Sequence, residues 1–160
     1  MAAKGDLVRI RPGLYWKGPK TTAGMVEPDP MRVGIQIGGS GSGPAGVSAA
    51  RVFGLTTQVP AFAEVAVPIR IPRPVEGVRF SSRSRHRLTR GLTPTEVALL
   101  ETLRLWPDIS EEPWSTLVSA VRSLIRTGKI RIEVITAVAA AEQSKVVRDL
   151  LRDLVANLAP

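Results

Sequence analysis

The last 68 residues of the chain carry a helical pattern that leaves little room for another kind of fold. From Thr93 onward, apolar residues recur at spacings of three and four, which is the period of a helix with one buried face. The pattern predicts four helices: one from Thr93, one between Ser110 and Gly128, one over residues 132–141, and one that ends the chain. A doubly wound sheet needs strands alternating with helices, so this half of the chain excludes it.

Capping residues and apolar faces support these helices. Thr93, Pro94 and Glu96 predict a capping box, with Thr93 as N-cap, Pro94 in the first turn and Glu96 reaching back. The last predicted helix carries an apolar face made of Val146, Val147, Leu150, Leu151, Leu154, Val155 and Leu158. We expect such faces to form the core, and a dimer interface is the alternative for the last helix.

The first part of the chain predicts strands and short helices. Residues 6–17 (DLVRIRPGLYWK) have two β-forming runs around Pro12-Gly13, which predicts a tight hairpin. Residues 29–39 are ambiguous, since their apolar residues alternate as in a strand while Asp29, Pro30 and the closing glycines are helix punctuation. We favour a short helix there.

Another helix and two strands are expected before Thr93. The segment GPAGVSAARVFGL predicts a helix of about ten residues that ends at Gly54. The runs 61–69 and 76–82 predict two strands, which we expect to pair antiparallel.

The expected fold class is therefore α+β, with a wing-like N-terminal hairpin, a small antiparallel sheet with helices, and a C-terminal group of about four helices. The expected domains are residues 1–22 and residues 23–160.

The excess of positive over negative charge lies entirely in the first part of the chain. Residues 1–92 hold 14 Lys or Arg against 5 Asp or Glu, whereas residues 93–160 hold 8 against 9. Such an asymmetry favours a polyanionic partner, most often nucleic acid. The alternative is a surface that is basic only for solubility.

The composition also excludes several classes of protein. The chain has no cysteine, which rules out disulfide frameworks, cysteine-containing zinc sites and thiol nucleophiles. Its start lacks the apolar run of a signal peptide, and no stretch approaches the roughly 18 apolar residues of a membrane span. We expect a cytoplasmic protein that does not associate with a membrane.

Gly41, Gly43 and Gly46 have the G-x-G-x-x-G spacing of a dinucleotide-binding turn. Such a turn binds a dinucleotide where a strand precedes the glycines and a helix follows them. An acidic residue about 20 positions later then hydrogen-bonds the ribose. Here a helix is favoured before the glycines, and the acid, Glu64, falls inside a predicted strand. We therefore expect a structural turn in which Gly46 and Ala49 pack closely, and no nucleotide cofactor.

No other pattern indicates an active site. His86 is the only histidine and lies in a run of arginines that would repel a metal cation. Glu111 and Glu112 flank a helix start, where acids interact well with the helix dipole. We predict no catalytic residue, no metal site and no enzymatic activity.

Two basic clusters are the candidate DNA-binding residues. The first lies on the hairpin, with Tyr15 and Trp16 among its cations: Arg9, Arg11, Lys17 and Lys20. The second comprises Arg79, Arg83, Arg85, Arg87 and Arg90. Arginine and lysine on a protruding hairpin suit phosphate contacts, which give affinity without reading sequence, and a tip arginine could enter a minor groove. The alternative for each cluster is a solvated face.

Three stretches resemble a known family. AAKGDLVRIRPGLYWKG resembles the end of a winged helix-turn-helix domain, with the tail of the recognition helix followed by the wing. GPAGVSAARVFGLTTQVPAFAEVAV resembles the second domain of the abortive-infection type IV antitoxin family, the AbiEi-like transcriptional regulators. LTPTEVALLETLR and the closing helices fit the same domain, so the resemblance covers nearly the whole chain.

The resemblance implies a DNA-binding antitoxin. Members repress their own operon and counteract a nucleotidyltransferase-like toxin without a tight complex, so we expect operator or non-specific DNA as partner and no direct toxin complex. The chain begins where the recognition helix should end, so the helices that read bases are missing. Either Met1 is internal to a longer reading frame, or the chain is a natural remnant that binds the backbone only. A protein-interaction module that neutralises a toxin or docks a partner is the alternative function.

Overall fold

Short strands predominate at the start of the chain and helices at its end in the computed structural model, which describes residues 7–159. The elements in chain order are β1 (Val8–Arg11), β2 (Leu14–Trp16), β3 (Lys20–Thr21), β4 (Gly24–Met25), α1 (Pro30–Gly38), β5 (Gly43–Pro44), α2 (Gly46–Val52), β6 (Ala63–Val67), β7 (Val78–Ser82), α3 (His86–Thr89), α4 (Pro94–Leu105), α5 (Trp114–Arg126), α6 (Ile132–Ala139) and α7 (Lys145–Leu158). The expected α+β class is confirmed.

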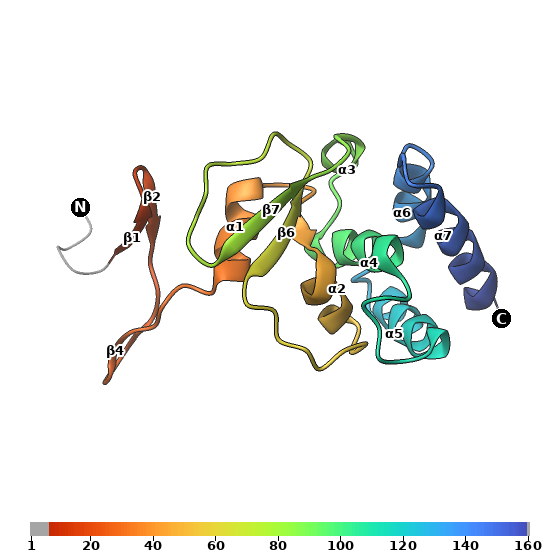
Figure 1. Cartoon of the computed structure of the whole chain (residues 1–160), viewed down its shortest axis with the longest axis horizontal. Helices are drawn as coiled ribbons and strands as arrows, with labels where there is room; N and C mark the ends of the chain where they lie inside the picture. The colour runs from red at the N-terminus through yellow and green to blue at the C-terminus, as the bar shows by residue number, and fades with distance from the viewer. Residues whose placement is uncertain (1–6, 160) are drawn as a thin grey trace.

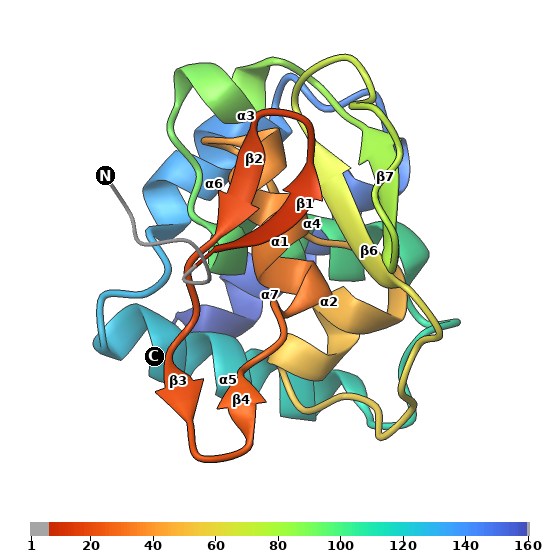
Figure 2. The same ribbon diagram turned by 90° about the vertical axis from the view of Figure 1, so that its left-hand side faces the viewer.

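The elements lie in sequence along the long axis of the molecule (Figure 1). The β1–β2 and β3–β4 hairpins lie at one end, α1 and the sheet come next, and α4 to α7 form the other end. Seen from the hairpin end, β1 and β2 lie in front of α1, while β3 and β4 project beyond the body of the molecule (Figure 2). The hairpins are thus the outermost elements on this side.

Segment 30–38 is a helix, as its capping residues predict. The Asp29 side chain accepts a hydrogen bond from the Met31 amide at 3.1 Å, and Pro30 lies in the first turn. Gly34 faces the sheet, because a Cβ at this position would lie 2.7 Å from Cγ2 of Val65. The N-cap and the close approach to β6 together outweigh the strand-like alternation of the segment.

The two runs expected to pair antiparallel are parallel instead. β6 and β7 pair in register from Ala63–Val78 to Val67–Ser82. Within the described residues, β6 pairs antiparallel with the short β5 alone, which gives the order β5–β6–β7. The proline-rich connection 68–77 bends at residues 68–70, returns the chain along the length of β6 and turns again at residues 76 and 77 before β7 begins. If the two runs formed an antiparallel hairpin, a turn would join them and the chain would not run back along β6.

The four C-terminal helices are confirmed, with α4 at their centre. Residues 96–103 of α4 are all buried, and its contacts include α2, α6 and α7. The predicted capping box is present, since the Thr93 hydroxyl accepts from the Glu96 amide and the Glu96 carboxylate accepts from the Thr93 amide. One buried apolar cluster joins α2, β6, α4, α5, α6 and α7. The helical half of the chain therefore supplies most of the core.

The N-terminal part contains a second hairpin that was not expected. β3 and β4 pair antiparallel, and the expected domain boundary at residue 22 falls in the turn between them. The chain then reaches α1 through residues 26–29.

Candidate nucleic-acid interface

The β1–β2 hairpin forms as predicted around Pro12-Gly13. Its residues pair antiparallel as Val8–Trp16, Arg9–Tyr15 and Arg11–Leu14, with an irregularity between Arg9 and Arg11. Gly13 has a φ of 80°, a left-handed turn conformation that suits glycine.

Two hydrogen bonds hold the hairpin against the rest of the chain. The Trp16 indole Nε1 donates to the carbonyl of Val26 at 3.3 Å, which links the hairpin to the segment after β4. The Arg11 guanidinium Nη1 donates to the carbonyl of Arg73 at 3.4 Å, which links it to the 68–77 connection. These bonds set the orientation of the hairpin without covering its outer surface.

The first basic cluster is largely exposed. Arg9, Lys17 and Lys20 are exposed, whereas Arg11 is half-buried because it contacts the 68–77 connection. The Tyr15 ring, opposite Arg9 in the hairpin, is also exposed. Arg9, Arg11 and the Tyr15 ring thus lie on the β1–β2 hairpin and Lys17 directly follows it, whereas Lys20 lies in β3 of the second hairpin and not on the first hairpin as expected.

The second basic cluster divides into surface and interior residues. Arg79, Arg85 and Arg90 are exposed, and the Arg79 guanidinium carbon lies 4.9 Å from the centre of the Phe62 ring. Arg83 is half-buried, and Arg87 is completely buried. The expectation that Arg87 contacts DNA is therefore wrong, since no part of its side chain reaches the surface.

Arg87 is buried because two acidic residues from distant segments surround it. Its Nη1 lies 2.6 Å from Glu101 and its Nε lies 2.7 Å from Glu142, and both glutamates are buried. Arg83 makes two 2.8 Å bonds to Glu101, and Arg104 makes a 2.8 Å bond to Glu142. Three arginines thus share two buried carboxylates.

Electrostatics keep Glu101 ionised. Burial alone would raise the pKa of Glu101, but the hydrogen bond from Arg83 and the charges of Arg87 and Arg83 hold that pKa below its ordinary value. The network is thus ionic, and it ties α3 and β7 to α4 and to the segment before α7.

The glycine-rich turn has a packing role. At Gly41 a Cβ would lie 2.7 Å from the backbone carbonyl of Arg87, so this turn approaches α3 closely. At Gly46, where α2 begins, a Cβ would lie 1.6 Å from Oε2 of Glu64. A carboxylate thus already lies at the helix end where a pyrophosphate would bind, and Glu64 is within β6 as expected. The predicted close packing at Gly46 is confirmed.

Glu111 has a role that differs from the expected one. Its carboxylate accepts from the Thr57 amide at 2.8 Å and from the Gln58 side chain at 3.3 Å, three residues before α5 begins. The pKa of Glu111 is lowered, chiefly by the bond from the Thr57 amide. Glu111 therefore fastens the GLTTQVP loop, whereas the sequence predicted an acid acting on a helix dipole.

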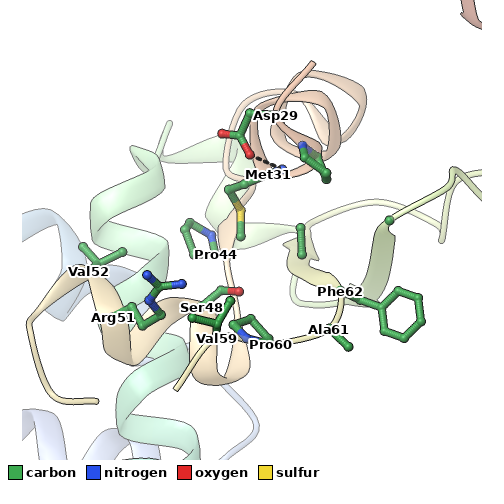
Figure 3. A pocket seen from close by; sticks show the side chains of 13 residues that line it. Asp29, Met31, Pro44, Ser48, Arg51, Val52, Val59, Pro60, Ala61 and Phe62 are labelled. Carbon is green, nitrogen blue, oxygen red and sulfur yellow. Dashed lines mark hydrogen bonds between the residues drawn. The ribbon is translucent and has the colours of Figure 1, made fainter. Parts of the chain in front are cut away.

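A hollow of about 600 Å³ lies beside this loop, between α1 and α2. Met31 extends from α1 toward Pro44, Arg51 projects from α2, and the Phe62 ring points away at the far side (Figure 3). Val59 in the loop is 77% exposed and Phe62 is 45% exposed. This apolar surface is a second candidate site, and the sequence analysis did not identify it.

Two further exposed arginines were also missed by the sequence analysis. Arg70 and Arg73 lie in the 68–77 connection, and both are exposed. The segment PIRIPRP could have predicted their exposure, because proline-rich segments favour an extended backbone that is solvated at the surface. Pairing of Arg11 with the Arg73 carbonyl brings this basic segment next to the hairpin.

Other site types are not indicated. Within residues 7–159, no group of three or more His, Cys, Asp or Glu side chains is placed to hold a metal ion. No helix in the described part of the chain has the length and apolar character needed to cross a membrane.

Comparisons with known proteins give a fold relationship only. No family model matches the chain, and no curated protein sequence matches it. A crystal structure of the Rv2827c protein from Mycobacterium tuberculosis is similar in fold, with a TM-score of 0.55 at 16% sequence identity. The similarity covers 96% of this chain and 61% of the mycobacterial chain, so this chain spans less than two thirds of that protein.

Proposed function

We propose that this chain is a cytoplasmic, non-enzymatic transcriptional regulator of the antitoxin type that binds DNA through the β1–β2 hairpin. The observation that carries the proposal is the exposure of Arg9 and Lys17 on an element that projects from the body of the molecule. Mobile cationic side chains on such an element can neutralise phosphates on both sides of a groove.

The distribution of charge supports this surface over others. Arg73 in the connection after β6, Arg79 in β7 and Arg85 after β7 are all exposed. Several acids of the C-terminal half are by contrast buried in ion pairs, as Glu101 and Glu142 are. The excess of exposed positive charge therefore lies in the part of the chain before α4, which includes the hairpin.

The antitoxin assignment rests on the resemblance of GLTTQVP and its neighbouring segments to the type IV antitoxins. In this proposal the chain binds DNA through the backbone, at its own operator or elsewhere, and it is functionally paired with a nucleotidyltransferase-like toxin without forming a complex with it. Reading of bases in a major groove is not part of the proposal, because the hairpin contacts described above suit the backbone.

Fluorescence anisotropy across a salt series tests DNA binding. The chain is titrated with duplex DNA from its own upstream region and with a scrambled duplex of equal length. We expect similar affinities for the two duplexes and a log–log salt slope near −0.9 per phosphate contact. A flat salt response would overturn the proposal, and a preference for the upstream duplex would show that the chain also reads sequence.

A pair of double variants assigns the binding to the hairpin. Arg9→Ala with Lys17→Ala should weaken binding and make the salt slope shallower by about 2 units. The matched control, Arg126→Ala with Lys129→Ala, removes two exposed charges from the end of α5 and the turn after it, in the helical end of the molecule. Equal weakening by the two double variants would exclude the hairpin as the contact surface.

The exposed apolar surface beside the GLTTQVP loop favours a second candidate function, a protein-interaction module. Val52, Val59 and Phe62 are exposed around the hollow, and clustered exposed apolar side chains often mark interaction sites. Val59→Asp would abolish toxin neutralisation in a growth assay and leave salt-dependent DNA binding intact if this function holds. Unchanged neutralisation would exclude it.

A further inference from the structure

The carboxyl ends of the two parallel strands meet at a second hollow, which has a volume of about 330 Å³. β6 ends at Val67 and β7 ends at Ser82, so the segments that follow both strands leave the sheet at the same edge. The hollow is lined by Pro68, Ile69, Arg70, Ser82, Arg83 and Arg85. Ligands of open sheets with parallel strands bind at this edge, because the loops there converge.

Three arginines line this hollow, and none of the lining residues is acidic. Within the described part of the chain, no hydrogen bond or ion pair engages the side chains of Arg70 and Arg85, and both are exposed. Three like charges around one small space repel each other. An anion in the hollow would relieve that repulsion.

Arg83 is held in place by contacts on the opposite side. Its Nε and Nη2 each donate to Glu101 at 2.8 Å, and its Nη1 donates to the carbonyl of Ser82 at 2.9 Å. The Ser82 hydroxyl in turn donates to the carbonyl of Ile69 at 2.9 Å, which fastens the two segments together. The floor of the hollow is therefore fixed before any ligand arrives, which lowers the entropic cost of binding.

The ionic network behind the hollow does not cancel its charge. Among the residues that the structure describes, Arg83, Arg87 and Arg104 pair with Glu101 and Glu142 alone, so the network keeps an excess of one positive charge. Arg70 and Arg85 add two more at the surface. A singly charged carboxylate would leave this excess, whereas a phosphate group offers several oxygens and up to two negative charges to guanidinium forks.

We propose that this hollow is a phosphate-binding site in which Arg70 and Arg85 donate to the phosphate oxygens and Arg83 supplies fixed positive charge. The phosphate is either a backbone phosphate of a nucleic acid or the phosphate of a soluble phosphorylated molecule. The site is separate from the hairpin surface and does not depend on the hairpin binding DNA.

Titration of the whole chain with inorganic phosphate tests the site. Nitrogen-15 NMR follows the Nε–H signals of the arginines, with sodium chloride at equal ionic strength as the reference. We expect saturable shifts for Arg70 and Arg85. Small, non-saturating shifts spread over all exposed arginines would overturn the proposal.

Matched double variants assign the binding. Arg70→Ala with Arg85→Ala should weaken phosphate binding by about tenfold or more, since the charge-assisted hydrogen bonds of both guanidinium groups are lost. The control, Arg51→Ala with Arg126→Ala, removes two exposed arginines from helices away from the hollow. All four positions are exposed, so the fold should persist, which circular dichroism verifies. Equal phosphate affinity of the two double variants would overturn the proposal.

Competition with duplex DNA identifies the source of the phosphate. If phosphate displaces DNA and the Arg70/Arg85 variant binds DNA weakly, the site holds a backbone phosphate. If that variant loses phosphate binding and keeps its DNA affinity, the ligand is a soluble phosphorylated molecule. The Arg9/Lys17 variant should bind phosphate normally, so failure of the hairpin proposal and failure of this site give different results.

Discussion

Arg87 and Glu101 form an ion pair in the interior, with Nη1 of the arginine 2.6 Å from Oε1 of the glutamate and both side chains inaccessible to solvent. The pair joins α3, a helix of four residues, to α4, which is the most buried helix of the chain. Glu142 is a second partner of the same arginine, with its Oε1 atom 2.7 Å from Nε of Arg87. A short, polar helix is thereby fixed to the core through charge.

Replacement of Arg87 by methionine should destabilise the fold strongly. Arg87→Met leaves Glu101 and Glu142 buried with fewer partners, and breaking a buried pair in this way costs about 3–5 kcal/mol. Chemical denaturation measures the loss in the free energy of unfolding. The control is Arg90→Met at the exposed end of α3, and a similar effect of the two variants would contradict the role assigned to Arg87.

Acid should destabilise the protein through Glu96, the buried capping residue of α4. Burial alone would raise the pKa of Glu96, but bonds from the Arg131 side chain and from the Thr93 and Arg131 amides hold it below the ordinary value of 4.5. A carboxylate with a lowered folded-state pKa stabilises the fold fully above its unfolded-state pKa. This stability is lost as the pH falls from about 4.5 through the folded-state pKa.

Comparison with Glu96→Gln isolates this effect from the other acids. The variant should be less stable than the wild type near pH 7, and the difference should shrink as the pH falls below 4.5, where the wild-type carboxyl becomes protonated. Denaturant unfolding at a series of pH values measures both curves. A difference that stays constant with pH would show that the charge of Glu96 does not contribute.

Gly41→Ala should be far more damaging than Gly128→Ala in the turn after α5. Both glycines have positive φ, 79° and 72°, so an alanine at either position carries backbone strain of about 1–2 kcal/mol. At Gly41 the new Cβ would also lie 2.7–2.8 Å from backbone atoms of Arg87 and Leu88, whereas at Gly128 it would meet nothing within 4 Å. Denaturation of the two variants measures the additional cost, and equal losses would show that the turn at Gly41 and α3 do not require their close approach.

The helices could be predicted because their signals are local. Thr93, Pro94 and Glu96 are adjacent in sequence, and the alternative assignment of segment 30–38 was decided by Asp29 and Pro30, which are adjacent to it. The β1–β2 hairpin likewise follows from the turn residues between its strands. Each of these features depends on contacts within a few residues of the chain.

The pairing of β6 with β7 and the burial of Arg87 depend on distant contacts. A run of apolar residues does not show the direction of its partner strand, and here the connection 68–77 returns the chain to the start of β6, so that β7 runs parallel to it. Arg87 looks like its exposed neighbours in the sequence, yet its partner Glu142 lies 55 residues away. No local pattern distinguishes such an arginine from a DNA-binding one.

Glu111→Ala should loosen the GLTTQVP loop and leave the core intact. The Glu111 carboxylate is the acceptor for the Thr57 amide and hydroxyl and for the Gln58 side chain, at 2.8, 3.2 and 3.3 Å. Without it, the exposed Thr57 amide loses its protein partner, so we expect faster hydrogen exchange there and little change in α4. Glu112→Ala is the matched control, because the contacts of Glu112 run through its backbone amide and carbonyl to Ser110. If amide hydrogen exchange at Thr57 is equally fast in both variants, Glu111 does not hold the loop, and other contacts must fix the loop beside the apolar hollow.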